Sequence, residues 1–135
     1  MSRISAVRLR DAVLDPGSFV SWDTTPVDVR ADPKYASELA DARAATGLDE
    51  SVLTGAGTVS GGPVAVVACE FDFLAGSIGV AAAERVTAAV ERATAEKLPL
   101  LASPSSGGTR MQEGTVAFLQ MVKIAAAVTM HKQAH

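Results

Sequence analysis

The stretch that decides the fold class is Val64 to Ser103, "VAVVACEFDFLAGSIGVAAAERVTAAVERATAEKLPLLAS". It begins with an almost continuous apolar run, Val64 to Cys69, which is typical of a strand covered on both faces. From Ile78 to Lys97 the apolar residues recur about every 3.6 residues, which predicts an amphipathic helix. The segment "LPLLAS" then predicts a second short buried strand. Strand, helix and strand in this order form a βαβ unit with parallel strands and a right-handed crossover.

Two further strands and two helices are predicted on the N-terminal side of this unit. The segment "SVLTGAGTVSGGPVAVVAC" predicts an antiparallel pair of strands with a turn at Gly61-Gly62. Before it, "SFVSWD" predicts a short strand, and residues 4–14 have the pattern of a helix. A second helix should begin at Asp32-Pro33, as N-cap and first helical residue, and end at Gly47.

This division predicts a helical N-terminal segment over residues 1–50 and an α/β core over residues 51–135. The last segment, "GTVAFLQMVKIAAAVTMHKQAH", reads as a helix without a stop signal. We therefore expect a core that is truncated at its C-terminus.

Composition and charge exclude several classes of function. Of the 135 residues, 48% are hydrophobic and only 4% aromatic, so the core must consist of Ala, Val, Leu and Ile. The net charge of −3, without a basic cluster, does not suggest a nucleic-acid-binding protein. No apolar segment reaches the roughly 18 residues of a membrane span, and the N-terminus lacks the pattern of a secretory signal. A cytoplasmic protein without a membrane partner is expected.

Few side chains suggest conventional catalysis or metal binding. Cys69 is the only cysteine, which excludes an internal disulfide, and we expect it to be a buried small residue. His131 and His135 are expected to be solvated, and this set of ligands does not predict a metal site. Ser105 and Ser106 have no histidine at a recognisable spacing, so a serine hydrolase is not indicated.

A glycine pair follows the second strand of the βαβ unit, in "SPSSGGTRMQEG". Thr109 and Gln112 match a capping box, which predicts a helix beginning near Thr109. Backbone N–H groups of Gly107 and Gly108 would then lie at a helix N-terminus, where they can hold an anion or a developing oxyanion. The alternative is a tight turn that requires glycine for steric reasons alone.

A second glycine-containing loop, Gly76 to Gly79, follows the first strand of the same unit. Because both strands are expected to be parallel, the two loops should meet at the carboxyl edge of the sheet, where α/β proteins bind ligands. Arg110 would oppose the dipole of the predicted helix at a cost of about 0.3–1 kcal/mol, which Glu113 could offset. Arg110 could therefore form a surface ion pair, brace the loop or reach an anionic ligand or partner.

The motifs "FDFLAGSIG", "LPLL" and "SGGTRMQEG", in this order, resemble the carboxyltransferase β subunit of biotin-dependent acetyl-CoA and acyl-CoA carboxylases, especially of the actinobacterial type. The resemblance covers about Val64 to Val128 and, more loosely, Glu50 to Gly62. It implies the N-terminal part of an α/β, crotonase-like fold of ββα units. It also implies transfer of a carboxyl group from carboxybiotin to acyl-CoA, giving malonyl-CoA for fatty acid biosynthesis. The carboxybiotin is held by a partner, the biotin carboxyl carrier protein.

The same resemblance assigns roles to individual residues. Gly107 and Gly108 would be the oxyanion hole for the enolate of the acyl thioester, and Gly76, Ser77 and Gly79 would line the loop near CoA. No metal is implied in this chain, which lacks the four-cysteine zinc ribbon of some bacterial β subunits. The family usually has glycine where this chain has Ala75, a difference that bears on substrate specificity, and alanine where it has Thr109.

The resemblance also implies partners, because family members have a second crotonase-like half or subunit that completes the site. We therefore expect an oligomer that includes this complementary half and the biotin carboxylase or carrier subunit, and no turnover by this chain alone. One alternative is a non-catalytic fragment that binds CoA or assembles with carboxylase subunits. Another is a different crotonase-type enzyme, such as an acyl-CoA decarboxylase subunit or a hydratase, and a hydratase would need a carboxylate in the site, for which Glu113 is a candidate.

Overall fold

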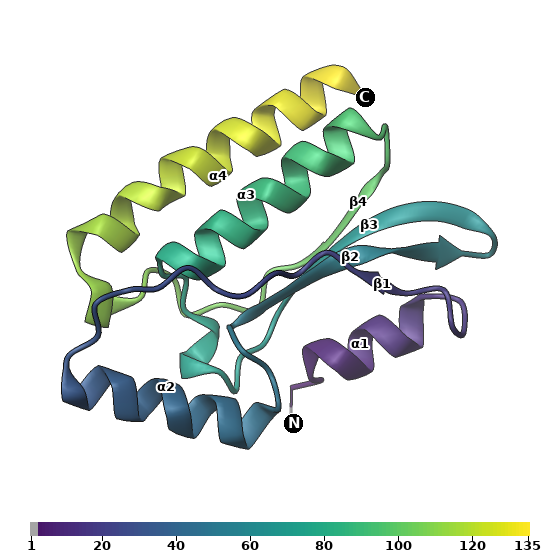
Figure 1. Ribbon diagram of the computed structural model, residues 1–135. Coiled ribbons are helices and arrows are strands. Elements are labelled where there is room, and N and C mark those ends of the chain that lie inside the picture. Colours follow the sequence, from purple (N-terminus) through teal and green to yellow (C-terminus); the bar gives the residue numbers. More distant parts are fainter. Residues whose placement is uncertain (1–2) are drawn as a thin grey trace.

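The computed structural model describes residues 3–135 as one four-stranded sheet with helices on both faces (Figure 1). The elements in chain order are α1 (Ala6–Val13), β1 (Val20–Ser21), α2 (Pro33–Thr46), β2 (Val52–Val59), β3 (Gly62–Cys69), the short 3₁₀ helix η1 (Leu74–Gly76), α3 (Val80–Ala95), β4 (Leu100–Ser103), a second 3₁₀ helix η2 (Met111–Glu113) and α4 (Thr115–Ala134). No helix among these residues is long and apolar enough to cross a membrane.

The sheet has the order β1-β2-β3-β4, with β3 and β4 parallel and the other pairs antiparallel. The predicted strand, helix, strand unit is thus confirmed as β3, α3 and β4. The hairpin turn lies one residue earlier than predicted, at Ser60-Gly61, and Gly62 already belongs to β3. Ser60 and Gly61 both have left-handed backbones (φ 49° and 80°), which the tight hairpin turn requires.

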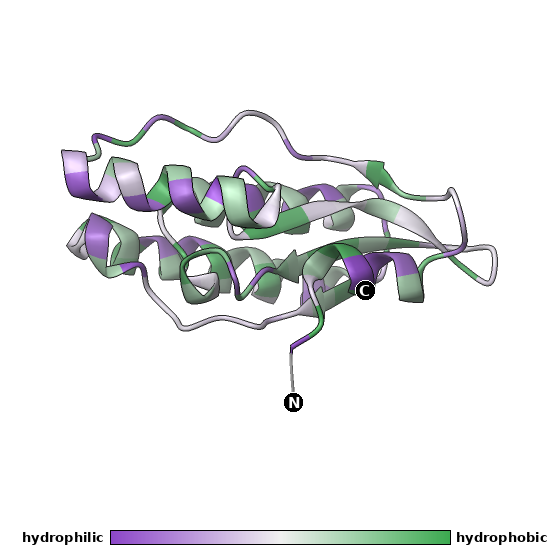
Figure 2. Cartoon of the chain, turned by 90° about the horizontal axis from the view of Figure 1, so that it is seen from below, coloured by the Kyte–Doolittle hydropathy of each residue, from purple (hydrophilic) through white to green (hydrophobic). Residues whose placement is uncertain are grey.

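The two faces of the sheet carry separate cores because successive strand residues point to opposite sides. Val52 and Val67 pack against α3, with α4 on the outer side of that helix. Leu53, Val66 and Ala68 lie in the other core, together with residues of α1. In Figure 2 the strands are predominantly hydrophobic, and the hydrophilic residues lie mainly on helices and connecting segments.

The prediction that β4 is buried is wrong. Leu101, in its centre, is 42% exposed. Among the described residues β4 is one of the two edge strands of the sheet, with β1 at the other edge, and it pairs only with β3.

The second helix begins and ends where its caps predict. Asp32 accepts a hydrogen bond from the backbone of Tyr35 (2.8 Å), and Gly47 ends α2 in the left-handed conformation (φ 71°). These two residues were sufficient to predict the start and the end of α2, because each satisfies backbone groups of the helix itself.

The predicted start of the last helix is wrong, as is the solvated position predicted for His131. Thr109 forms an extended bridge with Ile78, and α4 begins only at Thr115. His131 is buried because its face of α4 packs on α3, where its Nδ1 lies 3.0 Å from Oγ1 of Thr94.

Candidate active site

Two glycine loops meet at the carboxyl edge of the parallel strands. The first glycine loop (residues 70–79) connects β3 to α3, and the second (residues 104–110) follows β4. Because β3 and β4 are parallel neighbours, both loops leave the sheet at the same end. The predicted meeting of the two loops is therefore confirmed.

Backbone hydrogen bonds join the loops directly. The N–H of Gly107 donates to the carbonyl of Ala75 (2.8 Å), and the N–H of Ile78 donates to the carbonyl of Gly108 (2.8 Å). The N–H of Arg110 in turn donates to the carbonyl of Ile78 (2.9 Å). This pairing holds Thr109 in an extended bridge with Ile78, which is why the helix predicted from Thr109 does not form there.

The five predicted site residues lie in two different environments. Gly107 and Gly108 are exposed, whereas Gly76, Ser77 and Gly79 are buried. The three buried residues shape the site through their backbone and packing. Their predicted place beside CoA stays a prediction.

The buried glycines are sterically required. A Cβ added at Gly76 would collide with the carbonyl oxygen of Ser105, and one at Gly79 would collide with the carboxylate of Glu113. Gly76 also has a left-handed backbone (φ 66°). Glycine at position 76 therefore allows the two loops to approach each other closely, and glycine at position 79 leaves room for the Glu113 carboxylate.

Both predicted oxyanion amides have an acceptor within the chain. Gly107 N–H is bonded to Ala75, and Gly108 N–H donates to Oγ of Ser106 (3.0 Å). That hydroxyl itself donates to the carbonyl of Gly76 (2.6 Å). A ligand oxygen that binds here would accept a hydrogen bond from the Gly108 N–H. It would do so either in place of the Ser106 hydroxyl or together with it.

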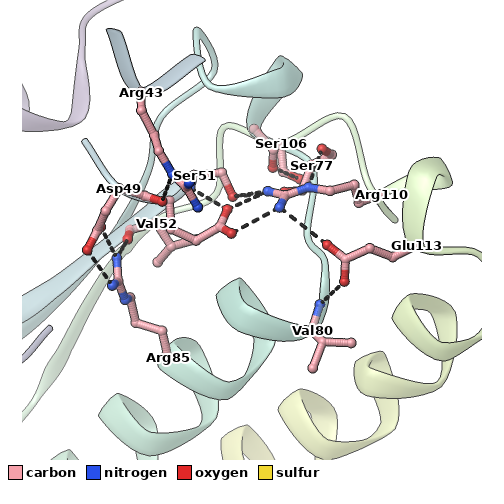
Figure 3. A network of polar contacts seen from close by, with 12 residues as sticks. Arg43, Asp49, Ser51, Val52, Ser77, Val80, Arg85, Ser106, Arg110 and Glu113 are labelled. Atoms are coloured by element: carbon pink, nitrogen blue, oxygen red, sulfur yellow. Dashed lines mark hydrogen bonds and ion pairs between the residues drawn. The ribbon is translucent and has the colours of Figure 1, made fainter. Parts of the chain in front are cut away.

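Arg110 lies inside the protein, so the predictions that it occupies a first helical turn, pairs at the surface or reaches a ligand are wrong. Its side chain is fully buried, and its guanidinium group forms hydrogen bonds with both carboxylate oxygens of Glu50 (2.5 and 3.0 Å). It also donates to the carbonyl of Ser77 (2.7 Å), a residue that lies beside Arg110 in Figure 3. Burial lowers the pKa of Arg110, but the bonds and charge of Glu50 outweigh it, so the pKa lies above its ordinary value. The contact with Ser77 agrees with the alternative that Arg110 braces the loop.

Glu113 lies at the other end of this hydrogen-bond network, beside Arg110. Its Oε1 accepts a hydrogen bond from the N–H of Val80 (2.7 Å), and its Oε2 accepts one from the hydroxyl of Tyr35 and lies 3.5 Å from Arg110. Burial and the bond to Glu113 raise the pKa of Tyr35 to about 12. With its side chain only 6% exposed, Glu113 holds protein groups together and has no free carboxylate oxygen for a substrate.

Sequence reasoning missed Glu50 and the role of Tyr35. Glu50 stands in the polar segment "GLDES", which reads as an ordinary solvated loop, and Tyr35 reads as a packing residue beside Leu39. No local pattern indicates either contact, because the partners lie 60 and 78 residues away.

Comparison with known proteins identifies the family of this chain. Residues 3–134 match the carboxyl transferase domain family model. The chain belongs to the carboxyl transferase domain family. Among the described residues of this family member, no group of His, Cys, Asp and Glu side chains is arranged to hold a metal ion.

Relatives of this carboxyl transferase domain include subunits of acyl-coenzyme A and acetyl-coenzyme A carboxylases. A probable biotin-dependent acyl-coenzyme A carboxylase beta3 subunit of Mycobacterium tuberculosis is 77% identical over 99% of the chain, which covers 27% of that relative. An acetyl-coenzyme A carboxylase carboxyl transferase subunit beta of a Synechococcus strain is 41% identical over 98% of the chain, covering 47% of the relative. The chain thus spans about a quarter to a half of the length of these two relatives.

A solved structure of the transcarboxylase 12S core superimposes with a TM-score of 0.76 and 27% identity, covering 93% of this chain and 23% of that one. The predicted crotonase-like α/β fold is thereby confirmed.

Proposed function

We propose that this carboxyl transferase domain is part of the carboxyltransferase component of an acyl-CoA carboxylase. The observation that supports this most strongly is the pair of glycine loops at the sheet edge, which presents Gly107 and Gly108 at the surface. Family membership and the 77% identical carboxylase β-subunit relative support the same assignment.

In this proposal the acyl thioester oxygen binds at the exposed glycine pair. Loss of the proton from the α carbon places negative charge on that oxygen, and backbone N–H groups stabilise the resulting enolate. Removing one such donor costs about 2.7–4 kcal/mol of transition-state stabilisation in a typical oxyanion hole. Carboxybiotin on a partner carrier protein supplies the carboxyl group that the α carbon accepts: its N–C bond breaks, and the released ureido nitrogen takes up the proton lost from the α carbon.

The surface of α4 supports a complementary carboxyltransferase half as partner. Its exposed apolar side chains, between 55% and 68% exposed, are Val116, Phe118, Leu119, Val122 and Met130. Other apolar residues of α4 pack against α3, so the helix is apolar on most sides, which is typical of a helix buried within a larger protein.

The test is reconstitution. The chain should be mixed with a complementary carboxyltransferase polypeptide and biotinylated carrier protein, and malonyl-CoA formation from acetyl-CoA should be measured. Turnover that requires both polypeptides supports the proposal. Absence of acyl-CoA binding by the chain, alone and in the mixture, would contradict it.

A second candidate is a non-catalytic module that assembles with carboxylase subunits. The internal acceptors that Gly107 and Gly108 already have favour this alternative, because a ligand oxygen would have to compete with the Ala75 carbonyl or the Ser106 hydroxyl for these N–H groups. It predicts association with the complementary polypeptide without turnover. A hydratase that uses Glu113 is not proposed, because that carboxylate is fully engaged by Val80 and Tyr35.

A further inference from the structure

We infer that the buried Glu50–Arg110 pair is a positioning pair, which sets the distance between the two glycine loops and so the direction of the Gly107 and Gly108 N–H groups. This inference rests on the proposed function for its consequence in acyl-CoA binding. Neither residue touches the exposed glycine pair, so both act through the loops.

Arg110 holds both loops at once. Its backbone belongs to the second glycine loop and donates to the carbonyl of Ile78 in the first. Its side chain contacts the first loop at Ser77, whose carbonyl accepts from Nη2 (2.7 Å) and whose hydroxyl accepts from Nε (3.2 Å). A shift of the guanidinium group must therefore move one loop relative to the other.

Glu50 connects Arg110, and through it the two loops, to the sheet. It is 2% exposed and lies two residues before β2, whose first residue, Val52, pairs with Cys69 of β3. The N–H of Ser51 donates to Oε1 of Glu50 (2.7 Å), and the Ser51 hydroxyl donates to the same Ser77 carbonyl as Arg110 does (2.8 Å). The hydrogen bond from Ser51 thus holds the Glu50 carboxylate independently of the guanidinium group.

The side chains of the pair act beside four single hydrogen bonds that also join the two loops. These bonds run from Gly107 to Ala75, from Ser106 to Gly76, from Ile78 to Gly108 and from the Arg110 backbone to Ile78. A buried ion pair need not add net stability, because the desolvation of two charges offsets their attraction. Fixing the loop geometry is a function that apolar residues of similar size cannot replace.

The decisive variant is the apolar double substitution Glu50→Met/Arg110→Met in the full chain. Each single substitution leaves one buried charge without its main partner and should destabilise the fold, whereas the double variant removes both charges of the pair and should recover much of that loss. Three quantities should be measured: urea unfolding, hydrogen exchange of the Gly107 amide by NMR, and affinity for acetyl-CoA.

We expect the double variant to recover stability but to exchange the Gly107 amide about tenfold faster or more, which corresponds to about 1.4 kcal/mol of lost protection. Its affinity for acetyl-CoA should fall by a similar factor. Recovery of stability together with wild-type exchange at Gly107 would overturn the inference.

A milder variant and a matched control complete the experiment. Glu50→Gln keeps the size and one acceptor, so it should fold and still accelerate exchange at Gly107; an unchanged rate would overturn the inference. Asp49→Asn breaks the Arg85–Asp49 pair (2.9 Å), which does not touch the loops, and should leave that rate unchanged.

If the wild-type chain does not bind acetyl-CoA, the proposed function fails, while exchange at Gly107 still decides the role of the pair.

Discussion

Glu113 Oε1 lies 2.7 Å from the amide nitrogen of Val80, a residue 33 positions earlier in the chain. Val80 is the first residue of α3, so the carboxylate satisfies an amide that has no partner inside the helix. The other oxygen of the same carboxylate accepts from Tyr35 of α2. A single side chain thus joins the start of α3 to α2 beside the candidate site.

Replacing Glu113 with alanine should therefore destabilise the fold. Val80 N–H and the Tyr35 hydroxyl would both lose their acceptor, and the expected loss is about 3 kcal/mol of unfolding free energy, measured by urea denaturation. Glu84→Gln is the control, because Glu84 forms an exposed ion pair with Lys123, which is worth about 1 kcal/mol or less. Equal effects of the two substitutions would contradict this prediction.

Gly79→Ala should destabilise the protein by about 1–3 kcal/mol through overpacking. The backbone of Gly79 (φ −100°) accepts any residue, so the cost comes only from the collision of the new methyl group with the Glu113 carboxylate. Gly62→Ala is the matched control, because its methyl group would lie 3.4 Å from the nearest atom outside the adjacent residues, the carbonyl oxygen of Val59. Thermal unfolding of both variants measures the difference, and a neutral Gly79→Ala variant would show that Glu113 can move away freely.

Deprotonation of Tyr35 should lower the free energy of unfolding at alkaline pH. Its pKa is raised to about 12 in the folded protein by burial and by the bond to Glu113, whereas the unfolded chain has the ordinary value of 10. Between these values the unfolded state loses the proton and the folded state keeps it, so the contribution is complete below pH 10 and is lost as the pH rises towards 12. The expected loss is about 2–3 kcal/mol by pH 12.

The measurement is the difference in unfolding free energy between the wild type and Tyr35→Phe from pH 9 to 12. This difference removes the shared titration of lysines and other groups. Parallel pH profiles of the two proteins would show that Tyr35 titrates normally in the folded state.

The apolar surface of α4 should control association. Phe118→Asp/Val122→Asp places charges where the side chains are 64% and 68% exposed, so the fold should be retained while self-association or binding of a complementary carboxyltransferase polypeptide weakens. Light scattering after size-exclusion chromatography measures this effect. Val59→Asp, at the exposed end of the hairpin, is the control and should leave association unchanged.

Local sequence patterns predicted most of the fold. The apolar run of β3, the 3.6-residue period of α3 and the Asp32 and Gly47 caps each specify structure within a few residues, so neighbouring residues alone are enough to indicate them. The parallel order of β3 and β4 also predicted that the two glycine loops lie at the same edge of the sheet. The capping box at Thr109 misled because pairing with Ile78 competes with the helix and prevails.

By itself the sequence determined the α/β class, the order of the elements and the position of the exposed glycine pair, because each depends on periodicity, on caps or on strand order. Only the tertiary structure decided what surrounds that pair. Arg110 and Glu50 are 60 residues apart, and charged side chains in polar segments are ordinarily solvated. They are buried here because the folded sheet brings a carboxylate and a guanidinium group together, and only this pairing offsets the cost of removing both charges from water.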